Sequence, residues 1–388
     1  MKVLVVHNRY RSAMPSGENN VVDTEVELLR NAGVDVHTFI RSSDEIASMP
    51  LSGRVAVALS PIDGRASRHA LREMLDRVRP DVVHLHNPYP LVSPTVIDDA
   101  RERGAAVVAT IHNFRLECMS GMLFRDGAIC TACEAHRFPW PGVRHGCYRD
   151  SYAQSTVMAS ALTMHRRRWQ GVSRFLAVSG FVADRLRQWG APTDRVVVKP
   201  NLTVDRGKAP GSGEGFLFGG RLVPEKGPLE LLDAWSASGL GGSERLVVAG
   251  DGPLRAEVQR RGATMKGVEF VGRLTPEQMH LMRCDTAVAV FPSLSLEPVS
   301  AAPESFAAGR PVLATRLGGL ATMVDDEVGW SVEPTVDALA AGLVAATDTD
   351  GRRQRGIAAR ARFDREYSAE VMVRRQLSIY SDACNDAV

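Results

Sequence analysis

A short loop in the second half of the chain carries two cations at a spacing suited to an anionic ligand. A strand-like run ends at Gly219 and Gly220. Arg221 and Lys226 follow, just before an amphipathic stretch that begins at Pro228. Glycines let a backbone approach a ligand closely, and cations beside a helix N-terminus favour an anion, so a diphosphate fits this arrangement. The alternative is a surface loop whose cations are simply solvated, as most Lys and Arg side chains are.

Two carboxylates lie further along the same half. Glu297 follows an apolar run that ends at Phe291, and Glu304 opens a small-residue helix that ends before Gly309. Carboxylate oxygens accept hydrogen bonds from vicinal hydroxyls, so this pair suits a ribose and a hexose. For Glu304 the alternative is an acidic residue in the first turn that complements the helix dipole.

Three histidines follow Val-rich runs in the first half. His84, His86 and Asn87 come after one run, and His112 and Asn113 come after the next. Ligands of open parallel sheets bind beyond the carboxyl ends of the strands, so these side chains should point into a cleft. A single His is more often a structural residue, but three of them at strand ends favour a site.

Four cysteines lie close together in the sequence: Cys118, Cys130, Cys133 and Cys147. One Cys-x-x-Cys with two outlying cysteines can build a tetrahedral structural zinc site, although the usual pattern has two close pairs. Reduced, packed thiols are the second interpretation. Disulfides are the third, and a cytosolic location would disfavour them.

The elements that must position these residues alternate along the whole chain. Short apolar runs such as 2–6 alternate with amphipathic stretches such as 21–32, as in parallel sheets covered by helices on both faces. The pattern is interrupted at 203–215, which is rich in Gly, Pro and charge, and then restarts. We therefore predict an α/β fold of two Rossmann-like, doubly wound domains, 1–203 and 204–388, facing across a cleft that holds the ligand.

Composition and charge narrow the class of protein. The 388 residues are 44% hydrophobic and 24% charged, which excludes intrinsic disorder. The net charge of +2 leaves no electrostatic footprint for nucleic acid. The start of the chain resembles a strand rather than a secretory leader, so a cytoplasmic location is expected. The stretch 151–169, with three consecutive arginines, predicts either a membrane-surface helix or, in our preferred interpretation, a packed one. Oligomeric state is not predicted.

Several of these runs together resemble a known family. GRLVPEKGPLELLDAW (220–235), VVAGDGPLRAEV (247–258), VEFVGRLTPEQM (268–279) and FPSLSLEPVSAAPESFAAGRPVLATRLGGL (291–320) are similar to the second domain of GT4-type glycosyltransferases. SGENNVVDTEVELLRNAGVDVHTF (16–39), AVSGFVADRLRQWG (177–190) and VVKPN (197–201) resemble the first domain. The resemblance implies the two-domain GT-B architecture over nearly the whole chain.

The implied activity is retaining transfer of a hexosyl-type sugar from a nucleoside-diphosphate sugar, of the UDP or GDP type, to an acceptor hydroxyl. The acceptor would be a glycan, a lipid-linked intermediate or a small natural product. No cofactor is expected for catalysis. Domain 1–203, with its cysteine-containing insert at 114–150, would be the acceptor side. Domain 204–388 would bind the nucleotide sugar, with its last helix packing back on the first domain.

The resemblance also assigns roles to single residues. Arg221 and Lys226 would bind the diphosphate and assist catalysis together with His112 and Glu297. The implied donor-binding set is Gly17, Arg221, Lys226, Gly272, Arg273, Glu297, Pro298, Val299, Ser300 and Glu304, with Glu304 on the ribose and Glu297 on the hexose. The acceptor region would include His84, His86, Asn87 and Asn113. One departure concerns the two Glu residues, which are one residue closer together than the family pattern.

Three other classes of protein remain open at this point. A sugar-nucleotide epimerase of the same architecture would lack an acceptor, which the insert at 114–150 argues against. A zinc-dependent nucleic-acid binder built on the cysteines conflicts with the near-zero net charge. A non-catalytic sugar-nucleotide-binding subunit would bind the donor without turnover, and the shortened Glu–Glu spacing keeps it in consideration.

Overall fold

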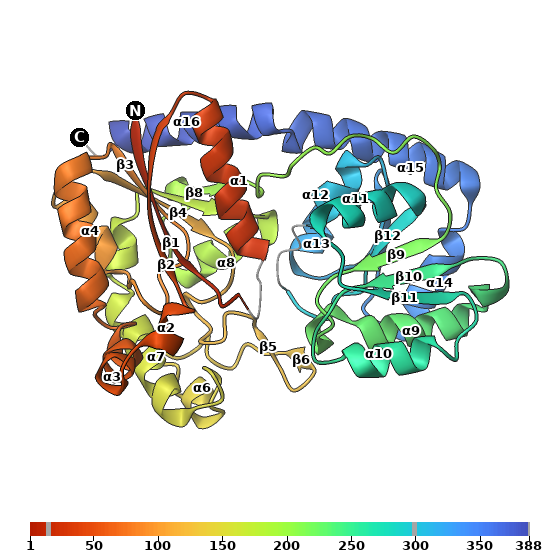
Figure 1. Cartoon of the computed structure of the whole chain (residues 1–388), viewed down its shortest axis with the longest axis horizontal. Helices are drawn as coiled ribbons and strands as arrows, with labels where there is room; N and C mark the ends of the chain where they lie inside the picture. Colours follow the sequence, from red (N-terminus) through yellow and green to blue (C-terminus); the bar gives the residue numbers. More distant parts are fainter. Residues whose placement is uncertain (13–16, 297–300, 387–388) are drawn as a thin grey trace. The chain divides into compact units, whose positions relative to one another are not determined.

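The computed structural model describes residues 1–12, 17–296 and 301–386. The chain divides into two compact units, each treated separately below (Figure 1). Unit 1 comprises residues 1–123, 131–202 and 369–388, and unit 2 comprises residues 124–130 and 203–368. Unit 2 includes a small antiparallel hairpin, β5 (Phe124–Arg125) and β6 (Ala128–Ile129).

Unit 1 is built on a six-stranded parallel sheet. In spatial order its strands are β2 (Asp35–Ser42), β1 (Lys2–Arg9), β3 (Val82–Leu85), β4 (Ala106–Ile111), β7 (Arg174–Ala177) and β8 (Val196–Val198). Its helices are α1 (Gly17–Asn31), α2 (Glu45–Ser48), α3 (Leu51–Leu59), α4 (Arg65–Val78), α5 (Thr95–Arg101), α6 (Trp140–Arg144), α7 (Tyr152–His165), α8 (Gly180–Trp189) and α16 (Ala369–Asn385).

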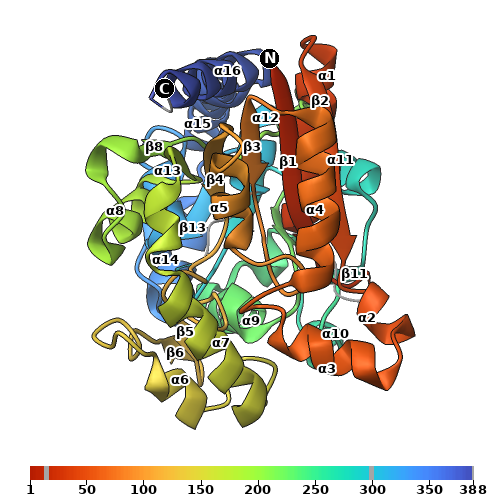
Figure 2. The same ribbon diagram turned by 90° about the vertical axis from the view of Figure 1, so that its left-hand side faces the viewer.

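Helices cover both faces of this sheet (Figure 2). Val3 and Val5 of β1 pack in one apolar cluster with residues of α1 and of the C-terminal helix α16. Leu4 and Val6 point to the opposite face and are also completely buried. Because the central strands β3 and β4 are buried along their whole length, their sequences are nearly continuous apolar runs rather than alternating ones.

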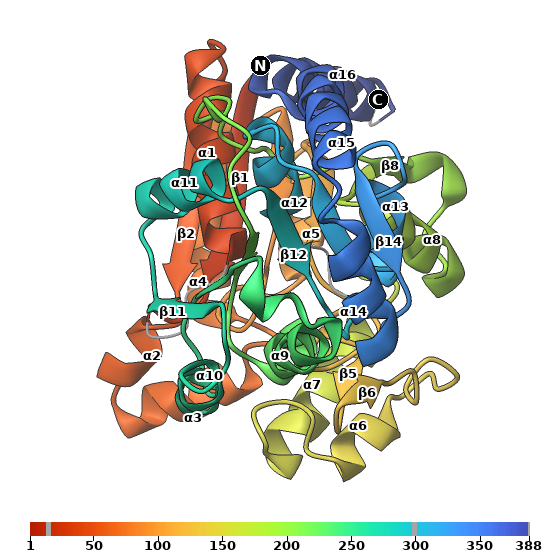
Figure 3. The same cartoon turned by 90° about the vertical axis from the view of Figure 1, so that its right-hand side faces the viewer.

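Unit 2 repeats the architecture with its own parallel sheet (Figure 3). In spatial order its strands are β11 (Val268–Gly272), β10 (Leu246–Ala249), β9 (Phe216–Gly219), β12 (Val288–Phe291), β13 (Val312–Thr315) and β14 (Gly329–Val332). Its helices are α9 (Pro228–Ser238), α10 (Arg255–Gly262), α11 (Pro276–Asp285), α12 (Ala301–Ala307), α13 (Gly318–Met323), α14 (Val336–Ala345) and α15 (Thr349–Arg362).

Two apolar clusters flank the sheet of unit 2. One joins Trp235 of α9 and Leu339 of α14 to the strands, and the other joins Phe306 of α12 to residues of β12 and β13. The two sheets and their helical layers confirm the predicted α/β class with two doubly wound, Rossmann-like units.

Local signals explain where several helices begin and end. The Ser179 hydroxyl accepts a hydrogen bond from the Val182 amide at the start of α8, and Gly190 ends that helix in the left-handed conformation. At the start of α9, Gly227 has φ +66°, and a Cβ there would lie 2.0 Å from the Pro292 carbonyl oxygen. Glycine is therefore required where the loop after β9 meets the loop after β12.

The stretch predicted as either a packed or a membrane-surface helix forms α7 and a short 3₁₀ turn. Met158 and Leu162 of α7 are buried in an apolar cluster. Arg166 donates to the Trp189 carbonyl at 2.9 Å, and Arg168 pairs with Asp98 at 2.6 Å. The contacts favour the packed interpretation. No helix in the described part of the chain is long and apolar enough to cross a membrane.

Candidate active site

Strand order explains where each unit can bind a ligand. In both sheets the chain starts near the middle, adds strands on one side, and then crosses to the other side. Such a reversal leaves a crevice beyond the carboxyl ends of the two strands at the switch. The switch lies between β1 and β3 in unit 1, and between β9 and β12 in unit 2.

In unit 2 the two loops at the switch contact each other. The Leu294 amide, after β12, donates to the Glu225 carbonyl at 3.0 Å, in the loop after β9. That loop carries Arg221 and Lys226 and leads directly into α9. Arg221 lies 3.6 Å from the buried Glu225 carboxylate, which holds its guanidinium near the loop while about half of the side chain stays exposed. The predicted basic pair thus lies at the strand-order reversal.

Glu304 lies in the first turn of α12, which follows β12. Its carboxylate pairs with Arg283 from the end of α11, and Arg283 is nearly buried whereas Glu304 remains partly exposed. Arg310 in turn donates to the Arg283 and Cys284 carbonyls and so ties the end of α11 to this region. Arg283 was not predicted as a site residue, because nothing in the local pattern of α11 distinguishes it from a solvated arginine.

The remaining residues predicted to bind the donor belong to other elements than the strands and loops at the strand-order reversal of unit 2, or lie outside the described residues. Gly272 ends β11 with φ +71°, and the exposed Arg273 follows it, on a strand separated from β9 by β10. Gly17 is the exposed first residue of α1, in unit 1. Glu297, Pro298, Val299 and Ser300 lie outside the described residues. The predicted roles of all these residues stay predictions.

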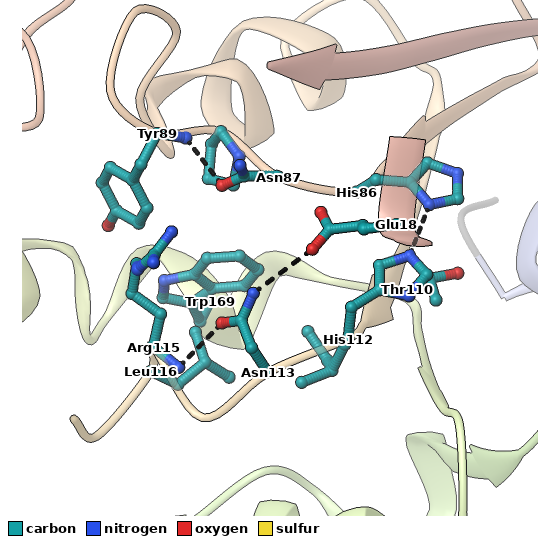
Figure 4. A pocket seen from close by; sticks show the side chains of 12 residues that line it. Glu18, His86, Asn87, Tyr89, Thr110, His112, Asn113, Arg115, Leu116 and Trp169 are labelled. Atoms are coloured by element: carbon teal, nitrogen blue, oxygen red, sulfur yellow. Dashed lines mark hydrogen bonds between the residues drawn. The ribbon is translucent and has the colours of Figure 1, made fainter. Parts of the chain in front are cut away.

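A small pocket lies at the carboxyl ends of β3 and β4 in unit 1 (Figure 4). His86, Asn87, His112 and Asn113, all predicted for the site, line it. His86 Nδ1 and His112 Nε2 are 2.9 Å apart, and the two rings stack. The structure therefore brings these four predicted residues together.

His84 was predicted with this group, but it does not line the pocket. It is completely buried, with Nδ1 2.6 Å from the Tyr380 hydroxyl and Nε2 2.7 Å from the Thr110 hydroxyl. Tyr380 belongs to the C-terminal helix, which packs over β3 and β4. His84 lies within β3 and contacts the C-terminal helix, whereas His86 follows the strand and lines the pocket.

The pocket also contains residues that the sequence analysis missed. The buried aromatic residues Trp169 and Tyr89 line its wall, and Glu18 and Arg115 supply opposite charges. Glu18 Oε2 is 3.5 Å from Asn113 Nδ2 and 3.3 Å from the Tyr10 hydroxyl. Charged and amide groups beside aromatic rings suit a ligand that has both hydroxyl groups and apolar ring faces.

Burial keeps the histidines of this region neutral. Desolvation, reinforced by His86, lowers the pKa of His7 to about 3. Desolvation, reinforced by His84, lowers the pKa of His86 to about 4. Desolvation and the neighbouring His86 also hold the pKa of His112 well below its usual range. Near neutral pH these imidazoles therefore act as neutral donors and acceptors of hydrogen bonds.

The four cysteines predicted as zinc ligands are all described. Cys118 Sγ lies 3.2 Å from the Ser120 hydroxyl. Within the described ranges, the group of three or more side chains whose ligand atoms could share one ion is Glu25, His84 and His86, and no three of the cysteines form such a group. Within unit 1, Cys118, Cys133 and Cys147 therefore do not form a preformed site for one ion, and Cys130 belongs to unit 2.

Zinc binding by the cysteines stays a prediction that removal of metal tests. Protein purified without chelator should contain about one zinc per chain. Chelation should then release it and lower the Tm, because a structural zinc contributes its binding free energy to folding. Elemental analysis together with thermal unfolding checks this. A metal-free preparation with an unchanged Tm would leave packed thiols as the better interpretation.

Comparison with known proteins identifies the family. Residues 16–202 match the Glycosyl transferase 4-like domain, and residues 213–348 match the Glycosyl transferases group 1 family. A GDP-mannose-dependent alpha-(1-6)-phosphatidylinositol dimannoside mannosyltransferase of Mycobacterium tuberculosis is 31% identical over 310 residues, covering 75% of this chain and 71% of that protein. The chain is a GT4-type group 1 glycosyltransferase.

The chain is also similar to a further relative and, in fold, to two solved structures. A D-inositol 3-phosphate glycosyltransferase of Acidothermus cellulolyticus is 27% identical over 324 residues, covering 78% of this chain and 67% of that protein. The sucrose-phosphate synthase of Thermosynechococcus elongatus has a TM-score of 0.71 at 18% identity, with 99% of both chains covered. Anabaena HepE in complex with UDP has a TM-score of 0.65 at 16% identity, covering 98% of this chain and all of that one. These solved structures confirm the GT-B fold.

Proposed function

We propose that this glycosyltransferase moves a hexosyl-type sugar, with retention of configuration, from a UDP- or GDP-sugar to an acceptor hydroxyl. The observation that carries the proposal is the strand-order reversal of unit 2. Arg221 and Lys226 follow β9 there, and Glu304 follows the adjacent strand β12. A diphosphate and a ribose are the groups that such cations and such a carboxylate recognise.

The relatives support the class of donor. The mycobacterial relative is named as GDP-mannose-dependent, and HepE was solved with UDP and with UDP-glucose. Both names describe a nucleoside-diphosphate ligand or donor of the kind proposed here. The base and the sugar are decided by the experiment below.

The proposed chemistry is mainly electrostatic. A nucleoside diphosphate is a good leaving group, so the enzyme must stabilise the negative charge that develops on its outer phosphate. Arg221, Lys226 and the N-terminus of α9 would supply this stabilisation. We propose that transfer needs no divalent metal. The Asp-x-Asp sequence of the chain, Asp348-Thr349-Asp350, lies at the start of α15, where Asp348 caps the helix by accepting from the Gly351 amide.

The acceptor would bind in the pocket of unit 1. Glu18, Asn113 and Arg115 line this pocket and offer partners for hydroxyl groups. Glycan and lipid-linked acceptors are the preferred classes, since several relatives are named as inositol or phosphatidylinositol glycosyltransferases. His112 lines the same pocket and is proposed to contact the donor sugar.

Thermal stabilisation by UDP, GDP, ADP and dTDP tests the proposed donor site. One nucleotide, present at a hundred times its dissociation constant, should stabilise the wild type by about 2.7 kcal/mol. Arg221→Ala should weaken this stabilisation because it removes a cation from the phosphates. Glu304→Ala should weaken it because the ribose loses its acceptor. If none of the nucleotides raised the Tm of the wild type, the fold would stand but the proposed donor site would be wrong.

A further inference from the structure

A buried polar network lies beneath the unit 1 pocket. It comprises Glu25 of α1, His84 and His86 of the β3 region, Lys199 after β8, and Gln376 and Tyr380 of α16. Glu25 is the centre of the network: Oε1 lies 2.8 Å from His84 Nδ1, 2.7 Å from Gln376 Nε2 and 3.4 Å from His86 Nε2. The proposed chemistry leaves this carboxylate without a role.

Glu25, His84 and His86 hold their ligand atoms close enough for a metal ion, but the carboxylate already has a protein cation. Lys199 Nζ lies 3.3 Å from Glu25 Oε2, and both side chains are 2% exposed. Gln376 donates to the other carboxylate oxygen. A buried ion pair of this kind keeps Glu25 charged. Burial alone would raise the pKa of Glu25, but Lys199 and then His84 hold it well below its usual range.

From Glu25 a chain of contacts leads to the pocket through two imidazoles. His86 Nε2 lies 3.4 Å from Glu25 Oε1, a charge contact without hydrogen-bond geometry, so this nitrogen has no hydrogen-bond partner among the described residues. His86 Nδ1 lies 2.9 Å from His112 Nε2, within hydrogen-bond distance. His112 lines the pocket, and its Nδ1 is buried without a hydrogen-bond partner among the described residues. His112 Nδ1, at the end of this chain of contacts, can therefore form one further hydrogen bond, either as a donor or as an acceptor.

The negative charge of Glu25 decides whether His112 Nδ1 is a hydrogen-bond donor or an acceptor. A bare His86 Nε2 would place a lone pair against the carboxylate, so the His86 proton belongs on Nε2. His86 Nδ1 is then an acceptor, and His112 must donate to it from Nε2. His112 Nδ1 is left with a lone pair that can accept a hydrogen bond from a hydroxyl group.

We propose that Glu25 and His86 are positioning residues that hold His112 in the Nε2-protonated form, so that its Nδ1 accepts a hydrogen bond from a sugar hydroxyl. The effect of this arrangement on catalysis rests on the proposed function, whereas the protonation pattern of His112 does not. Partners that orient a metal-bound histidine typically change affinity or activity by about 10- to 100-fold when removed, and we expect an effect of the same order here.

NMR of the protein labelled with ¹⁵N-histidine tests the protonation pattern directly. Correlations between ring carbon-bound protons and nitrogens distinguish a protonated nitrogen from a bare one. His112 is assigned by the loss of its signals in His112→Gln. We expect a protonated Nε2 and a bare Nδ1 in the wild type. A wild-type spectrum with the proton on Nδ1 would overturn the proposal, whatever the activity.

Substitution of Glu25 tests the consequence. Glu25→Gln should give a mixed or reversed pattern at His112 and lower kcat by about 10- to 100-fold, with the donor KM nearly unchanged. Glu25→Gln/Lys199→Met removes both charges and serves if the single variant does not fold. Asp99→Asn is the control, since Asp99 is a fully buried carboxylate paired with Arg68 and Arg72 instead.

The outcomes separate this proposal from the proposed function. An unchanged His112 spectrum and an unchanged kcat in a folded Glu25 variant would contradict the positioning role of Glu25. A wild type that binds no nucleotide and consumes no donor would contradict the proposed function, while its histidine spectrum would still decide the role of Glu25.

Discussion

Lys226→Met is expected to lower kcat for donor consumption by about 100- to 1000-fold. Removal of one preorganised group that stabilises developing charge typically has an effect of this size. Methionine keeps most of the length and the apolar stem of lysine, so the loop after β9 should keep its fold. The measurement is the rate of nucleoside-diphosphate release from the donor that the thermal-shift panel identifies. Arg221→Met should act in the same direction.

Lys266→Met is the matched control for this prediction. Lys266 is an exposed lysine of unit 2, near the end of α10 rather than in the loop after β9. Its replacement changes the net charge of the chain by the same amount and should leave kcat within about twofold. Equal losses in Lys226→Met and Lys266→Met would show that net charge matters and would contradict a local role for Lys226.

Acidification from pH 7 to pH 5 is expected to destabilise the protein steeply. His7 and His86 have folded-state pKa values of about 3 and about 4, whereas both titrate near 6.5 in the unfolded chain. The stability linked to each group is therefore complete above pH 6.5 and is lost as the pH falls toward the folded-state pKa. Each such histidine contributes a slope of roughly 1.4 kcal/mol per pH unit. His112 adds to the slope in the same direction.

Urea unfolding at a series of pH values measures this slope. His7→Gln should reduce this slope by the contribution of about one proton, because glutamine does not titrate. Glutamine can still donate a hydrogen bond to Asn19, the side-chain partner of His7. His69→Gln is the control, since His69 is largely exposed on α4. A flat stability profile between pH 7 and pH 5 would contradict the burial of neutral histidines.

Sequence reasoning succeeded where a feature depends on neighbouring residues. Helix α8 could be bounded because Ser179 and Gly190 act on the adjacent turns. The placement of His86 and His112 at strand ends followed from the general geometry of parallel sheets. The fold class could be predicted without coordinates because it depends on the type and order of the elements along the chain, which the sequence pattern already indicates.

It failed where a contact joins distant parts of the chain. His84 and Tyr380 are 296 residues apart, and only the return of the C-terminal helix to the unit 1 sheet brings them together. The pairing of Glu304 with Arg283 likewise depends on how α11 and α12 pack. Local patterns contain no information on such partners, so His84 was assigned to the pocket and Arg283 was missed.

The central claim is retaining transfer from a nucleoside-diphosphate sugar without a metal, and the direct test is ¹H NMR of donor consumption in EDTA. A panel of UDP- and GDP-sugars is incubated with the wild type, with water or an added glycan as acceptor, and Lys226→Met serves as the control. We expect the wild type to consume one donor and the released sugar to appear first with the anomeric configuration of the donor. Nucleotide binding without consumption would instead support the non-catalytic subunit, and an inverted product would contradict retention.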